Sequence, residues 1–531
     1  MRHIAVRAVP AAASGQGYPP AGDPGKVSPP PKGPHHTFTV CKKRGRCDFR
    51  SIQKAVDKAR AGDTIRIKRG TYREGVFVRG AKKRYLRIIG DPKHPSRVVL
   101  DGKRLKGARA NNAIFIDGAD QVTLRGLKAR HYKGNGFFVT NAVGYTFRNL
   151  IAERTGVYGI YAFNTKGGLM ADSEAYYVND GAFYIGQTPP QAKPIRSLVR
   201  NVSGWGSALG FSGTNMRYVT ITKSRFYNNA LGIAPNALDS EKYPPAEDNV
   251  IVDNDIFWNN FNFHKGAPFP QPKAGSTADI VPIGTGIILL GGRGNRVENN
   301  RIFGNFLAGV ALIDGILLQK NPDAVSLDNN QLTANQFGAG GTDVNGRDIA
   351  YDGSGNGNCF SGNQFSAPTF PADPARFPAC PFSGANGLST DDRGTMLSWA
   401  GQNALNAWVH HAHPARKGVE PLEVYGGGSS AGAATTAAVR RTRAVHVADN
   451  YFSPARLTVR RKTRISWRWP SYANSGAVHD VELVRAPKGV KKFHSDPAAS
   501  DYTFQRTLSV PGTYKLVCSY HEGMRMTIRV N

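Results

Sequence analysis

The chain of 531 residues has little acidic charge, few cysteines and no long hydrophobic run. It contains 38 Asp and Glu against 69 Lys and Arg, so its formal net charge is +31. No stretch approaches the ~18 consecutive apolar residues of a membrane-spanning helix, which excludes such a span. A Gly-X-Y period is missing too, which excludes collagen. Hydrophobic residues nevertheless make up 40% of the chain, which is too many for a wholly disordered protein.

Glycine is abundant, with 60 residues, and its share exceeds the usual ~7%. Together with many Asn and Thr residues, this composition indicates a turn-rich and mainly β protein. The positive charge favours acidic partners such as nucleic acid, an anionic glycan or the cell envelope. No nucleic-acid recognition motif accompanies it, so we expect no nucleic-acid partner.

The first 36 residues are rich in Pro and Gly, and we expect them to be disordered. Arg7 and Pro10 interrupt what would be the apolar part of a signal peptide, so export is not clearly encoded at this end. Four of the five cysteines stand in two loop-like segments, which predicts the disulfides Cys41–Cys47 and Cys359–Cys380. Disulfides imply an oxidising compartment, extracellular or periplasmic. The fifth cysteine is Cys518.

One glycine recurs at a regular interval in the first three quarters of the chain, followed each time by apolar or aromatic residues. Most steps are 22 or 23 residues, with one step of 29 and one of 54. If Asn262 replaces glycine in one unit, the long step divides into 30 and 24. A unit of about 22 residues is then repeated at least eight times. The recurring glycines are Gly136, Gly159, Gly181, Gly210, Gly232, Gly286 and Gly309.

Each unit also contains a short segment of alternating apolar residues, such as YTFRNLIA, which indicates a half-buried strand. Pairs of asparagines follow these strands, at Asn228-Asn229, Asn259-Asn260 and Asn299-Asn300. Asparagine suits a corner because its amide bonds to the backbone and to the asparagine of the next coil. One unit cannot bury its apolar face alone, whereas stacked units can. The repeat therefore predicts a β-solenoid.

The segment DFRSIQKAVDKARAGDTIRIKRGTYREGV resembles the opening of right-handed parallel β-helix proteins of the pectin-lyase-like type. The resemblance covers about residues 37–385 and implies an amphipathic helix over Ile52, Ala55, Val56 and Ala59 that caps the solenoid. It is specific for the fold and weak for activity. Related solenoids include polysaccharide lyases, polygalacturonases and periplasmic proteins that serve copper enzymes.

Catalytic residues are not identifiable in the repeats. A glycoside hydrolase needs paired carboxylates across a groove, and a lyase needs a basic residue and a means of neutralising the uronate. The loop LDSEKYPPAED offers Asp239, Glu241 and Lys242 as candidates for a glycan-binding site, and a solvated charged turn is the alternative. Residues 386–443 read as a linker, with a helix starting near Asp391 whose face comprises Leu397, Ala400, Ala404 and Trp408, followed by a flexible Gly/Ser/Ala tether.

The pattern changes from about residue 444 to densely alternating apolar residues, which indicates antiparallel strands. Near the end, Cys518, His521 and Met524 stand three residues apart, and His479 lies upstream. One thiolate, two imidazoles and one thioether are the ligand set of a type 1 (blue) copper site. A short loop after a strand brings three of these donors toward one metal, and His479 comes from another loop.

This region, residues 444–531, resembles the cupredoxins of the plastocyanin and amicyanin family through FSP, HDV, GTY and C-x-x-H-x-x-M. The resemblance implies a Greek-key β-sandwich that binds one copper ion through His479, Cys518, His521 and Met524. Amicyanin-like loops select Met524 as the axial ligand, and plastocyanin-like loops select Met526.

The leading hypothesis is an exported all-β protein in which a β-helix, binding an anionic polysaccharide or docking a partner, is tethered to an electron-transfer domain. The redox partner is not identifiable from the sequence. Two alternatives are a copper-delivery accessory protein and a polysaccharide lyase or hydrolase with an accessory cupredoxin. The first hypothesis predicts an electron carrier rather than an enzyme.

Overall fold

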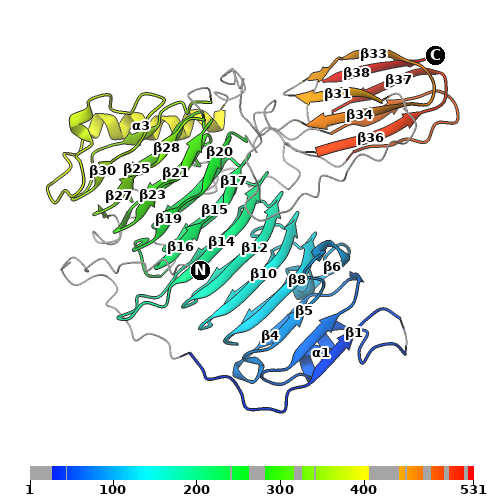
Figure 1. Cartoon of the computed structure of the whole chain (residues 1–531), viewed down its shortest axis with the longest axis horizontal. Helices are drawn as coiled ribbons and strands as arrows, with labels where there is room; N and C mark the ends of the chain where they lie inside the picture. Colours follow the sequence, from blue (N-terminus) through cyan, green and yellow to red (C-terminus); the bar gives the residue numbers. More distant parts are fainter. Residues whose placement is uncertain are drawn as a thin grey trace.

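A computed structural model describes residues 27–43, 45–238, 242–261, 281–315, 326–339, 343–405, 442–448, 451–469, 480–495, 502–518 and 524–531. The described part is all-β, as predicted (Figure 1). Parallel strands stack into a long solenoid, and a separate β-sandwich follows. None of the described helices has the length and hydrophobicity needed to cross a membrane.

One face of the solenoid is a ten-stranded sheet in which each strand pairs in parallel with the next coil. Ten strands in the described residues mean ten coils, which agrees with the expected minimum of eight. The strands are β4 (Val76–Arg79), β7 (Asn112–Asp117), β9 (Asn135–Thr140), β11 (Ile160–Phe163), β13 (Gly181–Gly186), β15 (Leu209–Thr214), β18 (Leu231–Asn236), β21 (Thr285–Leu290), β25 (Ala308–Ile313) and β29 (Ile349–Tyr351).

The other two faces belong to one eighteen-stranded sheet that bends along its length. In its middle coils the bend falls on residues with positive φ, such as Asn149 and Asp172. The strands are β1 (Thr37–Val40), β2 (Thr64–Ile67), β3 (Gly70–Tyr72), β5 (Arg87–Ile89), β6 (Val98–Asp101), β8 (Val122–Arg130), β10 (Tyr145–Glu153), β12 (Gly168–Tyr176), β14 (Ser197–Trp205), β16 (Val219–Thr222), β17 (Arg225–Tyr227), β19 (Val250–Val252), β20 (Asp255–Phe257), β23 (Arg296–Glu298), β24 (Arg301–Phe303), β27 (Gln331–Thr333), β28 (Gln336–Phe337) and β30 (Cys359–Ser361). A two-stranded ladder joins β22 (Gly292–Arg293) to β26 (Leu327–Asp328).

Most of the recurring glycines lie where the backbone of the next coil leaves no room for a side chain. A Cβ atom at Gly210 would meet the carbonyl oxygen of Gly232, 2.7 Å away, in the next coil. In the third of these coils the expected position is wrong by one residue, because Ala182, not Gly181, aligns with Gly159 and Gly210. The division at Asn262 is also wrong: β18 pairs directly with β21, so the 54-residue step is one coil with a long insertion.

Helix α1 (Ile52–Lys58) closes the first coil and buries Ile52, Ala55 and Val56, as predicted. Helix α3 (Thr390–Leu405) lies beside the last coils (Figure 1). The expected face is wrong at Leu397, which is exposed, while Met396 is buried and Trp399 packs on Phe370. Ala400, Ala404 and Trp408 fall outside the residues whose side chains are described. Short 3-10 turns are η1 (Ala81–Lys83), η2 (Pro95–Arg97), η3 (Gly107–Ala110) and η6 (Pro374–Arg376).

The C-terminal sandwich has two four-stranded sheets around a core that includes Trp467, Trp469 and Tyr514. The first sheet has the order β32-β31-β34-β36, and the second β33-β38-β37-β35. The strands are β31 (Thr442–Ala448), β32 (Tyr451–Ser453), β33 (Arg456–Val459), β34 (Thr463–Trp469), β35 (Glu482–Arg485), β36 (Tyr502–Leu508), β37 (Gly512–Val517) and β38 (Arg525–Val530).

Candidate metal centre

The hairpin of β37 and β38 positions two of the four expected copper ligands. The strands are antiparallel, with Leu516 opposite Met526 and Val517 opposite Arg525. The same register continued by one residue sets Cys518 opposite Met524. The backbone N–H of Cys518 donates to the carbonyl of Met524 at 3.1 Å, so the two residues form the last rung of the ladder.

The side chains of Cys518 and Met524 face the interior of the sandwich. Because side chains alternate along a strand, Cys518 shares the face of Leu516 and Tyr514, and Met524 shares that of Met526 and Ile528. Cys518 is 4% exposed and Met524 is 1% exposed, and both belong to the core of the sandwich. A thiol and a thioether thus lie together, buried, at one end of the hairpin.

Met526, the alternative axial ligand, lies two rungs deeper in the hairpin, on the same face. It is also 1% exposed, and its cross-strand partner is Leu516 rather than Cys518. Its surroundings in the sheet are therefore those of an ordinary core residue.

Strand β35 flanks the hairpin on the side of Cys518. Leu483 pairs with Leu516, and Glu482 pairs with Val517. Two hydrogen bonds fix the chain just before β35: Val481 N–H donates to Ser495 Oγ, and Ser495 N–H donates to the Val481 carbonyl, both at 2.9 Å. Val481 and Asp480 are buried, and His479 precedes them in the sequence.

The two expected imidazole ligands, His479 and His521, lie outside the described residues. Within the described part of the chain, no group of three or more His, Cys, Asp or Glu residues is arranged to hold a metal ion. The described half of the donor set fits copper in its chemistry, since both sulfur atoms are soft donors and both side chains are shielded from water.

The expected loop site on the solenoid is only partly visible. Asp239 and Glu241 fall outside the described residues. Lys242 is exposed, and its backbone ties the loop down: its N–H donates to Gln187 Oε1 at 3.0 Å, and its carbonyl accepts from Asn215 Nδ2. The glycan-binding role of these three residues stays a prediction.

Both predicted disulfides are present, joining Cys41 to Cys47 and Cys359 to Cys380. Cys518 takes part in neither of them.

Sequence reasoning missed an ionic cluster on the outer face of β8, β10 and β12. Lys128 Nζ lies 2.6 Å from Glu153 Oε2, and Arg154 also contacts this carboxylate. Burial opposes ionisation of Glu153, but Lys128 and Arg154 hold its pKa below the usual value. Burial raises the pKa of nearby Glu174, which accepts a hydrogen bond from Trp205 Nε1.

An aromatic ladder continues from this cluster along the solenoid. Its rings are nearly parallel, with centroids 4.6, 6.3, 5.0 and 5.0 Å apart, so each inner ring has both faces covered by its neighbours. Stacking on sugar rings needs a free face, so the three inner rings are structural. The recurrence of one aromatic per coil was the sequence signal: Tyr176, Trp205, Tyr227, Phe257 and Phe303.

No protein-family model and no curated protein sequence matches the chain. Several solved structures resemble a small part of it. The reduced state of an amicyanin mutant is 20% identical over 17% of this chain and 80% of its own, with a TM-score of 0.14. Pseudoazurin from Methylobacterium extorquens AM1 is 18% identical over 17% of this chain and 75% of its own, also with a TM-score of 0.14. The copper-containing nitrite reductase from Thermus scotoductus SA-01 is 23% identical over 19% of this chain and 24% of its own, with a TM-score of 0.15.

Proposed function

We propose that residues 442–531 form a type 1 copper domain that transfers single electrons. The observation that carries this proposal is the last rung of the β37–β38 hairpin, where Cys518 lies opposite Met524 and both side chains are buried. Thiolate and thioether are the sulfur donors that a type 1 site requires.

His479 and His521 complete the proposed donor set. His521 lies three residues from Cys518 and three from Met524, and three extended residues span at most roughly 11 Å, so its imidazole stays within reach of both. His479 precedes the segment that Ser495 holds beside the hairpin. The bound ion would alternate between Cu(I) and Cu(II).

The protein's own residues set the conditions for electron transfer. Cys518 would supply the thiolate, His479 and His521 the imidazoles, and Met524 the thioether. Burial of both sulfur atoms keeps water away, which limits solvent rearrangement when the charge changes. Four protein donors leave no position for a substrate, and this favours an electron carrier over an oxidase.

We also propose that the solenoid is the docking part of an exported protein, with an acidic redox protein, an anionic polysaccharide or the cell envelope as its partner. Two disulfides within the solenoid support an extracellular or periplasmic location.

Absorption spectroscopy on matched variants tests the copper proposal. The wild-type chain loaded with Cu(II) is expected to be intensely blue, because a thiolate bound to Cu(II) gives a strong charge-transfer band. Cys518→Ser removes that thiolate and abolishes the band, whereas Met524→Leu keeps the colour but shifts the band and raises the reduction potential.

Met526→Leu is the matched control, because Met526 lies beside Leu516 in the core. Its spectrum should be that of the wild type. A colourless wild-type protein after copper uptake would contradict the proposal, and a larger shift in Met526→Leu than in Met524→Leu would reassign the axial ligand.

A further inference from the structure

The positive charge of the chain is concentrated in two regions. Residues 42–133 contain 27 Lys and Arg against 8 Asp and Glu, a net charge of +19. Residues 134–441 contain 23 of each sign and are neutral, and residues 442–531 contain 15 against 6. Most of the +31 therefore belongs to the first coils of the solenoid.

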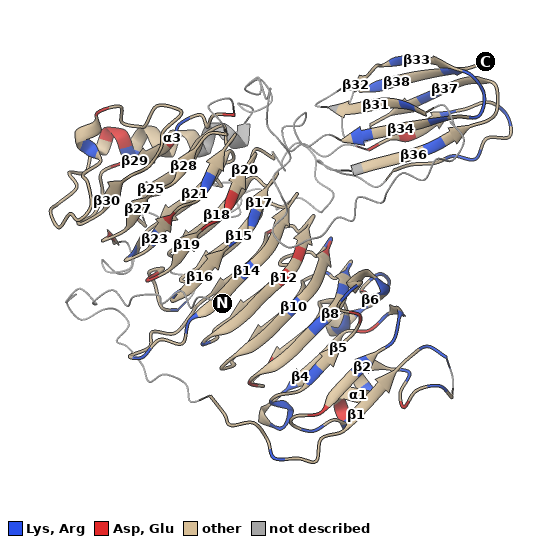
Figure 2. Ribbon diagram, in the orientation of Figure 1, with Lys and Arg blue, Asp and Glu red and all other residues tan. Residues whose placement is uncertain are grey.

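The stacking of the coils does not require this charge. The first coils and the neutral later coils share the same parallel pairing and one continuous core. Twenty-six of the 27 cations in residues 42–133 are described, and 23 of these have no carboxylate within 4.0 Å; the exceptions are Arg97, Lys128 and Arg130. Figure 2 shows the Lys and Arg positions gathered around β4, β5, β6 and β8.

Two charged residues of this region are committed to helix α1. Glu74 caps its N-terminus, accepting from Ser51 Oγ at 2.7 Å and from the N–H groups of Ile52 and Gln53 at 3.1 Å. Lys83 Nζ donates to the carbonyls of Val56 and Ala59 at the other end. The helix therefore needs no external ion at either end.

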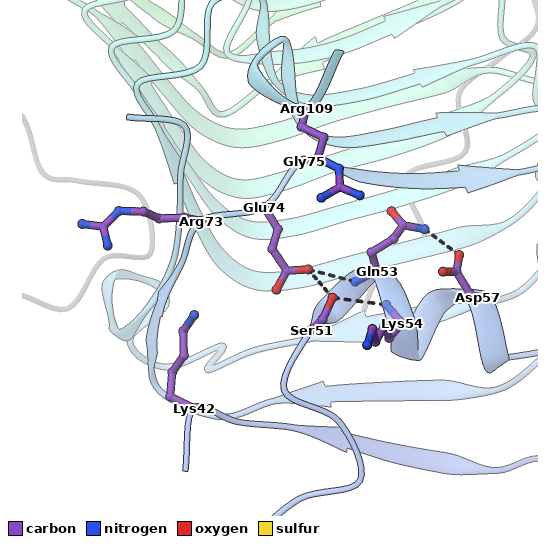
Figure 3. Close-up of a pocket in the computed structure, with 9 residues that line it drawn as sticks. All are labelled: Lys42, Ser51, Gln53, Lys54, Asp57, Arg73, Glu74, Gly75 and Arg109. Carbon is purple, nitrogen blue, oxygen red and sulfur yellow. Dashed lines mark hydrogen bonds between the residues drawn. The ribbon is translucent and has the colours of Figure 1, made fainter. Parts of the chain in front are cut away.

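A pocket of about 500 Å³ opens beside this helix (Figure 3). Four cations line it, and none has a carboxylate within 4.0 Å: Lys42, Lys54, Arg73 and Arg109. Lys42 and Arg109 point into the pocket from opposite sides, while the guanidinium of Arg73 points away. Both oxygens of Glu74 are occupied by the helix N-terminus, and Asp57 accepts from Gln53. The pocket thus presents more positive than negative charge to solvent.

We propose that residues 42–133 bind a linear anionic polysaccharide and that the pocket between Lys42 and Arg109 receives one of its anionic groups. This deepens the docking role proposed above for the solenoid and names the partner and the site.

The surroundings favour a polysaccharide over a nucleic acid. In residues 42–133 no described Phe, Tyr or Trp is exposed, whereas single-stranded nucleic acids are bound by stacking on exposed rings. The one α-helix in the described part of this segment has seven residues and covers the core, so it is not available for a DNA groove. The disulfide Cys41–Cys47 borders Lys42, which places this surface in an oxidising compartment.

Binding of the full-length chain to polygalacturonate, dextran sulfate and neutral dextran tests the proposal. Titrations at several NaCl concentrations give the affinity and its salt dependence. We expect binding to one or both anionic polymers, none to neutral dextran, and weakening with salt as counterions compete. The triple variant Lys42→Gln, Lys54→Gln and Arg109→Gln should bind roughly tenfold more weakly, with a salt slope smaller by about 2.

A control variant removes the same charge elsewhere: Arg456→Gln, Lys515→Gln and Arg529→Gln, all exposed on the sandwich. Its affinity for the anionic polymers should fall less than twofold. Equal losses in both variants would mean that total charge, not this site, drives binding, and would overturn the proposal. So would tighter binding to duplex DNA or to phosphatidylglycerol vesicles than to either polymer. The assay needs no copper, so its failure is distinguishable from that of the copper proposal.

Discussion

Asparagine side chains connect successive coils of the solenoid. At each ladder position the Nδ2 and N–H of one asparagine donate to Oδ1 of the next. The sequence predicts that asparagines occupy the corners, but it places the three Asn-Asn pairs at one equivalent corner. In the structure they belong to different ladders. Asn229 and Asn259 belong to one ladder, whereas Asn300 belongs to another with Asn254 and Asn335. Spacing along the chain did not reveal this, because insertions change the coil lengths.

Removing one ladder asparagine should destabilise the solenoid. Asn300→Ala leaves the N–H of buried Asn254 without its acceptor and removes one acceptor of its Nδ2. It also takes the Nδ2 donor from Asn335 Oδ1, which keeps only the backbone N–H of residue 300. We expect a loss of about 2 to 4 kcal/mol in the free energy of unfolding, measured by urea denaturation. The neighbouring Asn299→Gly is the control: its exposed amide bonds only to Asp253, and its φ of 51° suits glycine. Similar losses in both variants would contradict a special role for the ladder.

A partly buried carboxyl beside β13 makes the stability of the solenoid depend on pH. Burial raises the pKa of Asp180 to about 6, although a hydrogen bond with Tyr158 opposes the shift. The folded state then binds its proton more tightly than the unfolded state. The stabilisation is present below about pH 4 and is lost as the pH rises through 6. Asp180→Asn should gain about 1 to 3 kcal/mol relative to the wild type between pH 4 and 7. A difference that stays constant over this range would refute the assignment.

At the scale of elements, alternation of apolar residues predicts the strands well, because each inward position of a coil is buried. The buried face of helix α3, beside the last coils, is harder to predict. Its sequence allows more than one apolar face, and tertiary contacts decide between them. Arg393 fixes the rotation of α3, because its Nε donates to Asp352 at 2.9 Å and its Nη2 to Asp314 at 2.7 Å. That rotation turns Met396 inward and Leu397 outward.

Loss of the Arg393 anchor should loosen α3 specifically. Asp352 is fully buried, so Arg393→Met leaves a buried carboxylate without its cation, at a cost of about 3 to 5 kcal/mol. We expect faster amide hydrogen exchange in residues 390–405, with little change in β13 or β15. Leu397→Ala, at a side chain that is 42% exposed, should leave the exchange unchanged. If Leu397→Ala lost protection from exchange and Arg393→Met kept it, Leu397 would belong to the packed face of α3, as the sequence predicts.

At the scale of the molecule, the sequence predicts both halves, because a long repeat and a compact ligand motif are strong signals. The choice between Met524 and Met526 depends on strand register, which spacing alone does not supply. The aromatic ladder also emerges only when the coils are aligned, whereas the separation of charge can be counted along the sequence. Two of the proposed ligands, His479 and His521, rest on the sequence alone.

The division into two hydrophobic cores predicts two unfolding transitions. Among the described residues, the buried members of the large solenoid core end at Phe360, with Phe377 packed against them, and the core of the sandwich begins at Val445. Neither core therefore needs the other to bury its apolar surface. Copper should stabilise the sandwich alone: free ion at 100 times the dissociation constant contributes about 2.7 kcal/mol. For a unit of roughly 90 residues this raises the midpoint by about 10 °C or more in differential scanning calorimetry. Cys518→Ser should abolish the shift and leave the solenoid transition in place. A single transition, or a copper shift in both, would mean that the two cores unfold as one unit.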